Sequence, residues 1–263
     1  MDRDLETATF LFDMREAKRR EPRLSEQLTP GNLTEAYRAQ ERLVEKLLAR
    51  FGGHPIGYKI AATNVLAQKD MDVDAPFFGR LLSASTHSAP AVLSASPFTI
   101  RLIEAEFGFE MADDVPAAGA PYTAETVRQF IGSAFPSIEV VDHRFHNWKV
   151  VGAPTLIADN AIHGAWIEGA PYPGWREIDF ARHPVTVLVN GVRTYEGSGA
   201  NVLGNPLIVV AWLANELIKF GRQLRRGDKI TTGTTTAVYP AQAGDEVTAD
   251  FSDLGRVDLK FTA

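Results

Sequence analysis

Residues 101–110 read Arg-Leu-Ile-Glu-Ala-Glu-Phe-Gly-Phe-Glu, and their β-branched and aromatic residues predict a β-strand. Alternate side chains of a strand share a face, so Glu104 and Glu106 point one way while Ile103 and Phe107 point the other. Two neighbouring carboxylates repel each other unless a positive charge lies between them. A hard divalent cation such as Mg2+ would satisfy both, because such ions bind carboxylate oxygens. The alternative is that this acidic face is simply solvated.

The composition is that of a globular protein. The 263 residues fit one large domain, or one domain with a smaller appendage, and 45% of them are hydrophobic, enough for a sizeable core. A net charge of −6 with scattered basic residues argues against a nucleic-acid partner. The chain has no cysteine, which excludes disulfides and Cys-ligated zinc. With neither a visible secretory signal nor an apolar run of ~18 residues, we expect a cytoplasmic protein with no membrane partner.

Two helices are predicted at the start of the chain. The first covers residues 2–20, and its basic C-terminal end suits the helix dipole. The second covers residues 33–50 and begins at Asn32, a good N-cap. We therefore expect a helical N-terminal region, residues 1–53, followed by a mostly β catalytic domain, residues 54–263.

Two short strands each carry one isolated charge. The strand at residues 55–60 holds Lys59 among apolar neighbours, and alone this lysine could be a surface side chain lying along a strand edge. The strand at residues 136–142 holds Glu139, and a lone acid of this kind is usually solvated. A six-coordinate metal can nevertheless draw on several carboxylates, which makes this acid a possible further ligand.

Turn and cap residues divide the remaining sequence. A helix is expected from Thr123 to about Phe135, with the threonine as its cap. Asn190-Gly191 predicts a hairpin over residues 184–195. A helix over residues 206–220 follows, with a proline in its first turn and a glycine past its end.

Three histidines are candidates for acid–base chemistry. His143 and His146 lie in a polar, aromatic loop, and His163 precedes a strand. Each could be a proton carrier or simply a loop or surface residue. The His-Glu-x-x-His spacing of zinc proteases is not present.

Several short motifs follow one another in an order that resembles a known family. They are Gly57-Tyr58-Lys59, Phe78-Gly79-Arg80-Leu81, Ile103-Glu104-Ala105-Glu106, Pro136-Ser137-Ile138-Glu139-Val140-Val141-Asp142, Ala158-Asp159-Asn160, Gly197-Ser198-Gly199-Ala200, Leu203-Gly204-Asn205-Pro206, Thr232-Gly233 and Ala243-Gly244-Asp245. Over most of the chain their order and spacing resemble the hydratase/decarboxylase branch of the fumarylacetoacetate hydrolase superfamily. This branch contains the 2-keto-4-pentenoate hydratases and the 4-oxalocrotonate decarboxylases.

The resemblance implies both a fold and a site. The fold would be α+β, a mixed β-barrel or β-roll of the fumarylacetoacetate hydrolase C-terminal type with a small helical N-terminal region. Mg2+ or Mn2+ would be held by Glu104, Glu106 and Glu139. Lys59 would be the catalytic lysine, and near the cation and partly desolvated it would have a lowered pKa and could move protons. The backbone and hydroxyl groups of residues 233–235 (Gly233, Thr234 and Thr235) would bind the substrate carboxylate.

The implied activity is that of a metal-dependent hydratase, a lyase that acts on a short 2-hydroxydienoate or unsaturated 2-oxo acid through a metal-chelated enolate. One departure from the family pattern leaves alternatives open. Phe77 stands where many members have an acid, and a phenyl ring cannot transfer a proton. His143, His146 or His163 could replace that acid. Decarboxylation of a 2-oxo acid, C–C bond hydrolysis of an acylpyruvate and a non-catalytic binding role therefore remain alternatives, and a homo-oligomer is expected.

Overall fold

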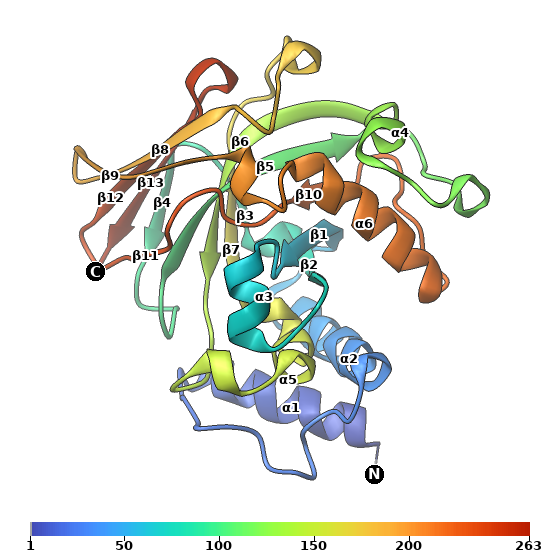
Figure 1. Ribbon diagram of the computed structural model, residues 1–263. Coiled ribbons are helices and arrows are strands. Elements are labelled where there is room, and N and C mark those ends of the chain that lie inside the picture. The colour runs from blue at the N-terminus through green and yellow to red at the C-terminus, as the bar shows by residue number, and fades with distance from the viewer. Residues whose placement is uncertain (1) are drawn as a thin grey trace.

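The computed structural model describes residues 2–263, and its helices and strands form one mixed fold (Figure 1). The α-helices are α1 (Arg3–Glu16), α2 (Leu33–Phe51), α3 (Val65–Met71), α4 (Ala124–Arg128), α5 (Ala153–Ala158) and α6 (Pro206–Lys219). Two short 3-10 helices border the candidate site, η3 (Trp148–Val150) and η4 (Asn160–Ile162).

The strands form two sheets. The eight-stranded sheet has the order β2 (Phe77–Leu82), β1 (Pro55–Ala61), β10 (Lys229–Thr231), β5 (Leu102–Met111), β6 (Ile131–Val141), β7 (His163–Glu168) and β3 (Thr86–Ser88), with β11 (Tyr239–Pro240) also paired to β5. The five-stranded sheet has the order β4 (Ala91–Ser94), β13 (Arg256–Thr262), β12 (Glu246–Asp250), β8 (Pro184–Val189) and β9 (Val192–Ser198). Most neighbours are antiparallel, but β1 with β10, β3 with β7, and β4 with β13 are parallel.

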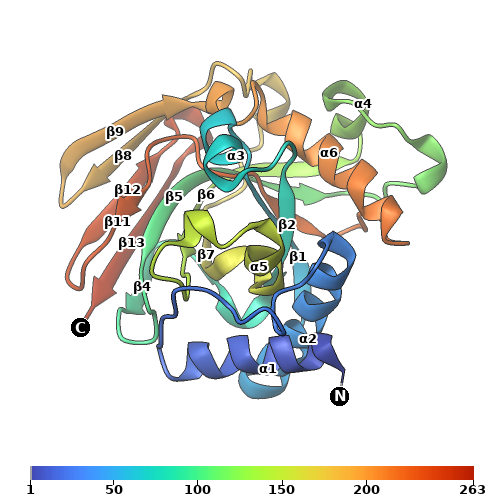
Figure 2. The same ribbon diagram turned by 60° about the horizontal axis from the view of Figure 1, so that its bottom comes forward.

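The eight-stranded sheet curls strongly, and this curl positions the candidate site. Figures 1 and 2 show its long strands β5 and β6 bending across the molecule, with the five-stranded sheet on one side and α4 and α6 on the other. Helices α1, α2 and α5 form a layer at the base. The curl brings β1 round toward β6 although β10 and β5 separate them in the sheet order.

Both faces of β5 are covered by protein, which the sequence alternation alone could not predict. Phe107 points away from the glutamate face and makes edge-to-face contacts with Phe180 and Phe251, at centroid distances of 5.4 and 5.0 Å. Burying such a phenylalanine stabilises the fold by about 1.5–3 kcal/mol. The apolar face thus anchors β5 in the core and leaves the opposite face for the carboxylates.

The predictions for the N-terminal helices are mostly confirmed. Helix α2 begins as expected, because the Asn32 side chain accepts a hydrogen bond from Glu35 N at 3.0 Å. Helix α1 ends at Glu16, so the expected placement of Lys18-Arg19-Arg20 at the helix end is wrong. Lys18 has a φ of 49° and terminates the helix. The division of the chain at residue 53 stays a prediction, and α2 packs against α5 of the later region.

The helix predicted from Thr123 to Phe135 is wrong over its second half. Helix α4 starts at the expected cap but ends at Arg128, and β6 begins at Ile131. The early part of β6 pairs with the far end of β5, as in the pairs Phe109 with Ala134 and, beyond a register shift at Glu110, Met111 with Ile131. Long-range pairing therefore overrides the local helical signal.

The other local signals are confirmed. Asn190-Gly191 joins β8 to β9, and both residues have positive φ, as this turn requires. Helix α6 starts at Asn205, whose side chain accepts a hydrogen bond from Leu207 N at 2.9 Å. Residues 199–219 are long and apolar enough to cross a bilayer by composition alone, but half of their most apolar part is buried within the fold. We interpret α6 as a core helix.

Candidate active site

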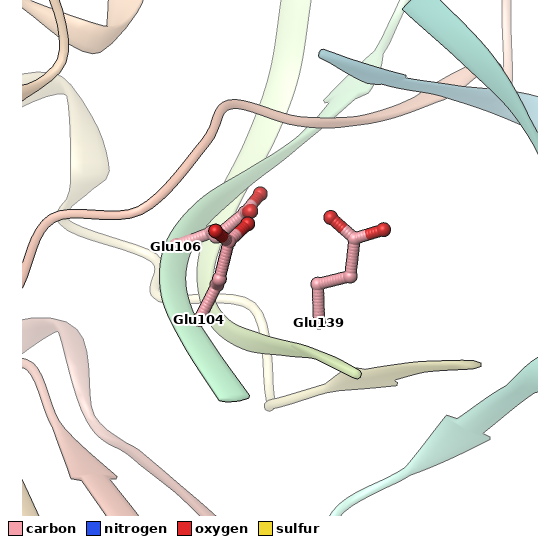
Figure 3. Close-up of side chains that lie close together, drawn as sticks. All are labelled: Glu104, Glu106 and Glu139. Carbon is pink, nitrogen blue, oxygen red and sulfur yellow. The ribbon is translucent and has the colours of Figure 1, made fainter. Parts of the chain in front are cut away.

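Three glutamates on adjacent strands converge on one face of the eight-stranded sheet. Glu104 of β5 lies directly opposite Glu139 of β6, and Glu106 lies two residues further along β5. One carboxylate oxygen of each residue lies within 4.8 Å of the others. Figure 3 shows the two β5 glutamates side by side with Glu139 facing them. The structure thus brings the three predicted ligands together in what we call the acidic cluster, while metal binding by them stays a prediction.

Lys59 reaches the acidic cluster from β1 because the sheet curls. Its Nζ lies 3.1 Å from Glu139 Oε2 and donates a hydrogen bond to Ala161 O at 3.2 Å. The side chain is 2% exposed, so the surface interpretation of this lysine is wrong. Burial alone would lower the pKa of Lys59, but the charges of Glu139, Glu104 and Glu106 outweigh burial and raise it. The expected lowering of the pKa therefore requires a cation that neutralises these carboxylates.

The charges of the acidic cluster are not balanced by the chain itself. Burial raises the pKa of Glu104 to about 7, and burial with the charges of Glu139 and Glu104 raises the pKa of Glu106 well above its usual range. Burial would also raise the pKa of Glu139, but Lys59 and His163 more than offset this effect and lower it. A divalent cation would relieve the repulsion that remains among the carboxylates.

The hydrogen bonds of the Glu106 carboxylate indicate whether the acidic cluster fits a metal ion. Its Oε2 accepts hydrogen bonds from Gly233 N, at 2.8 Å, and from the Thr231 hydroxyl. Its Oε1 is buried and has no hydrogen-bond partner among residues 2–263. An unsatisfied buried acceptor costs about 1–3 kcal/mol. An all-oxygen donor set with one unpaired buried oxygen fits a hard cation such as Mg2+ or Mn2+.

His163 is the histidine that contacts the acidic cluster. Its Nδ1 lies 2.8 Å from Glu139 Oε1, and its Nε2 lies 3.4 Å from the Ser85 hydroxyl. Burial lowers the pKa of His163, which favours the neutral ring. An ionised carboxylate only accepts hydrogen bonds, so the ring donates from Nδ1. His163 and Lys59 thus contact different oxygens of the Glu139 carboxylate.

The other two candidate histidines lie elsewhere. His143 is buried, and its Nδ1 accepts a hydrogen bond from Phe145 N at 3.4 Å. Burial and the nearby guanidinium groups of Arg20 and Arg144 lower the pKa of His143 to about 4. His146 is exposed. Neither belongs to the described residues that line the pocket at the acidic cluster, so their catalytic role stays a prediction without geometric support.

We expect His163→Phe to weaken Mg2+ binding by about tenfold to a hundredfold, because Glu139 would lose the hydrogen bond that orients it. Isothermal titration calorimetry measures this Kd directly. His143→Phe is the matched control, since it removes a buried histidine without a contact to the acidic cluster, and its Kd should stay within a factor of about two of the wild-type value. Equal affinity losses in both variants would contradict the positioning role.

An unusual backbone turn presents the acceptor for Lys59. Asn160, Ala161 and Ile162 of η4 have φ angles of 54°, 49° and 55°. This left-handed conformation is unfavourable for non-glycine residues, so surrounding contacts must maintain it. The Asn160 side chain accepts a hydrogen bond from Arg80 N at 2.7 Å and donates one to Arg80 O at 3.0 Å. We call residues 160–162 the left-handed turn.

Asp159 fixes the start of the left-handed turn. Its carboxylate is buried between two guanidinium groups, with Arg15 at 3.1 Å and Arg144 at 2.5 Å. Arg15 of α1 also donates hydrogen bonds to the carbonyl oxygens of Asp159, at 2.9 Å, and His163, at 3.0 Å. The first helix therefore restrains the segment that supports Lys59 and Glu139.

Glu104 of the acidic cluster and Lys59 line a cavity of about 760 Å3 between β1, α3, η3 and the segment after β10. Of the predicted substrate-binding residues, Gly233 and Thr234 line this cavity. Thr235 is buried outside the lining, and its hydroxyl donates to Ala105 O at 2.7 Å. Gly233 has a φ of +92°, and a Cβ there would lie 1.8 Å from Thr63 Oγ1, so glycine is required. Substrate binding by the three residues stays a prediction.

Comparison with known protein families places most of the chain in a family model. The model of the fumarylacetoacetate (FAA) hydrolase C-terminal domain matches residues 56–262. This range includes Lys59 and the whole acidic cluster, and the helices α1 and α2 precede it.

Individual proteins are similar over most of their length. The 2-keto-4-pentenoate hydratase of Burkholderia vietnamiensis (strain G4 / LMG 22486) is 30% identical over 232 residues, which cover 88% of this chain and 87% of that protein. The 2-hydroxyhexa-2,4-dienoate hydratase of Comamonas testosteroni is 31% identical and covers 80% of each. The structure of 4-oxalocrotonate decarboxylase from Pseudomonas putida G7, complexed with magnesium and adipate, matches with a TM-score of 0.89 at 28% identity. It covers 98% of this chain and 97% of that chain.

Proposed function

This chain belongs to the fumarylacetoacetate hydrolase family, and on that basis we propose that it is a divalent-metal-dependent hydratase, a lyase. Its substrate would be a short 2-hydroxydienoate or unsaturated 2-oxo acid of aromatic-compound degradation, as the names of its relatives indicate. The observation that carries the proposal is the acidic cluster beside the buried Lys59, at the base of a cavity large enough for such a substrate. We also propose the β-roll arrangement of this family for residues 54–263.

Glu104, Glu106 and Glu139 would hold Mg2+ or Mn2+. A solved relative is described in complexes with magnesium and with calcium, which supports a divalent cation. When bound, the cation would act as a Lewis acid toward the carboxylate and keto oxygens of the substrate and stabilise the enolate charge.

Lys59 would move protons at its Nζ. In hydration, the dienol loses its hydroxyl proton and gains a proton at C5, and water then adds its oxygen to C4 and a proton to C3. The hydrogen bond to Ala161 O and the ion pair with Glu139 fix the ammonium group at the base of the cavity. Such positioned proton transfer contributes about 10²- to 10⁴-fold to a rate.

Decarboxylation is the second candidate function, and Phe77 favours it. This residue is 3% exposed and lines the cavity where the family pattern has an acid. Loss of CO2 from a distal carboxylate that is conjugated with the 2-keto group leaves its electron pair in a dienolate, so this reaction needs the same enolate stabilisation but no activation of water. The solved structure of the similar 4-oxalocrotonate decarboxylase is in line with this alternative. Hydrolysis of an acylpyruvate would require a water-activating base, and among residues 2–263 no histidine lines the cavity.

Turnover of 2-hydroxypenta-2,4-dienoate tests the proposal. With Mg2+ we expect 4-hydroxy-2-oxopentanoate to accumulate in NMR spectra, and excess EDTA should abolish its formation. Release of CO2 from 4-oxalocrotonate without hydration of the dienoate would support the decarboxylase instead. Absence of both reactions, together with no enzyme-dependent deuterium exchange at C3 of 2-oxo acids, would exclude catalysis and leave a binding protein.

We further propose a cytoplasmic homo-oligomer. The support for this is the family membership, together with exposed apolar side chains such as Phe51, which is 56% exposed. Light scattering coupled to size-exclusion chromatography measures the oligomeric state.

A further inference from the structure

Besides Lys59 and Glu104, the cavity is lined by a group of large apolar side chains and by polar residues such as Asn201 and Thr234. Lys59 at the base is 1% exposed, whereas Leu66 of α3 is 69% exposed and Val238 is 36% exposed. Several large apolar side chains of the lining come from α3, β2, β5 and η3. The apolar wall consists of Leu66, Met71, Phe77, Leu102, Trp148 and Val238.

The cations of the cavity already have carboxylate partners. Among residues 2–263, the lysines and arginines that line it are Lys59 and Lys149. Lys59 is paired with Glu139, and Lys149 of η3 is paired with Asp70 of α3. A second carboxylate on a substrate would therefore lose water against the apolar wall and would have to compete with Asp70 for Lys149, which is unfavourable.

The cavity is also larger than the smallest substrate requires. A volume of about 760 Å3 is in the range that accommodates drug-sized ligands. A five-carbon dienoate has only about eight non-hydrogen atoms, far fewer than such ligands. With its carboxylate and keto oxygens at the acidic cluster, the rest of the apolar wall would remain uncovered.

We propose that the substrate carries an apolar alkyl or aryl group at the end remote from its 2-oxo acid, and that dicarboxylates are disfavoured. This inference rests on the proposed function for the orientation of the substrate, because it places the 2-oxo acid at the acidic cluster. This substrate preference would differ from that of a structural relative, whose complex contains the dicarboxylate adipate. The wall acts through burial of apolar surface, which increases affinity about fourfold for each methylene group covered.

Binding of two saturated 2-oxo acids of equal shape tests the inference without turnover. In 6-methyl-2-oxoheptanoate an isopropyl group replaces the distal carboxylate of 2-oxohexanedioate. In Mg2+ buffer, isothermal titration calorimetry should give a Kd at least about tenfold lower for the isopropyl compound. Equal affinity, tighter binding of the dicarboxylate, or no binding of either compound would overturn the inference. If the preference holds but no dienoate is hydrated, the inference stands and the proposed hydratase activity fails.

Separate substitutions of two adjacent α3 residues test whether the apolar wall causes the preference for the isopropyl compound. Leu66→Arg adds a cation to the wall and should reduce the preference for the isopropyl compound by about tenfold or reverse it. Val65→Arg adds the same charge to the neighbouring residue, which is 74% exposed and outside the cavity lining, and should leave the ratio of the two Kd values unchanged. Both side chains are exposed, so neither change threatens folding. An equal shift in both variants, or none in Leu66→Arg, would overturn the assignment of this wall.

Discussion

Lys59→Met is expected to lower kcat by about a thousandfold, because it removes the proposed proton carrier while keeping an unbranched side chain that is only one atom shorter. Steady-state hydration of 2-hydroxypenta-2,4-dienoate in saturating Mg2+ measures this effect. The ammonium group lies 3.1 Å from Glu139 and its side chain is 2% exposed, so the substitution also removes the ion-pair partner of a buried carboxylate. Circular dichroism in Mg2+ buffer checks that the variant is folded.

Lys149→Met is the matched control for this prediction. Lys149 also lines the cavity and also forms an ion pair, but its side chain is 49% exposed and its partner is Asp70. An exposed ion pair contributes about 0–1 kcal/mol, so kcat should change by less than about fivefold. Activity of Lys59→Met within tenfold of wild type would show that another group transfers the proton.

Glu106→Gln is expected to have opposite effects on stability with and without Mg2+. The pKa of Glu106 is raised, so its ionised form destabilises the metal-free fold at pH values above the unfolded pKa. The glutamine removes this cost and can still accept the hydrogen bond from Gly233 N. In EDTA, the variant should therefore have the same Tm as the wild type or a higher one.

In Mg2+ the order of the two proteins should reverse. The wild-type protein should gain about 2.7 kcal/mol when Mg2+ is present at one hundred times its Kd, whereas the variant should gain little and show no Mg2+-stimulated turnover. Thermal denaturation in Mg2+ and in EDTA measures both effects. Glu110→Gln, on the same strand but outside the acidic cluster, should respond to Mg2+ like the wild type. Normal turnover and a normal Mg2+ response in Glu106→Gln would refute the metal site.

The parts of the fold that the sequence predicts well are those with local causes. Asn32 and Asn205 cap their helices with their own side chains, and Asn190-Gly191 fixes its hairpin through two positive φ angles. The start of β6 was not predictable in this way. Ile131 joins the sheet because it pairs with Met111, twenty residues earlier, and such pairing is invisible in a local pattern.

Only part of the candidate site could be predicted from the local sequence pattern. The period of two along β5 places Glu104 and Glu106 on one face. The position of Glu139 depends on the register between β5 and β6, and that of Lys59 depends on the curl of the sheet. The sequence pattern marked both residues only as isolated charges in short strands, and the family resemblance assigned their expected roles. It could not single out His163 among three candidate histidines, because only the contact with Glu139 distinguishes it.

The left-handed turn depends on a residue of the first helix, which matters for chimaeric proteins. Arg15 of the first helix anchors Asp159, so the segment that contacts Lys59 is supported by a residue that lies outside the matched family range. A chimaera that grafts residues 54–263 onto a foreign leader would keep every group of the acidic cluster but lose this anchor. The N-terminal helices are therefore unsuited to free exchange between homologues.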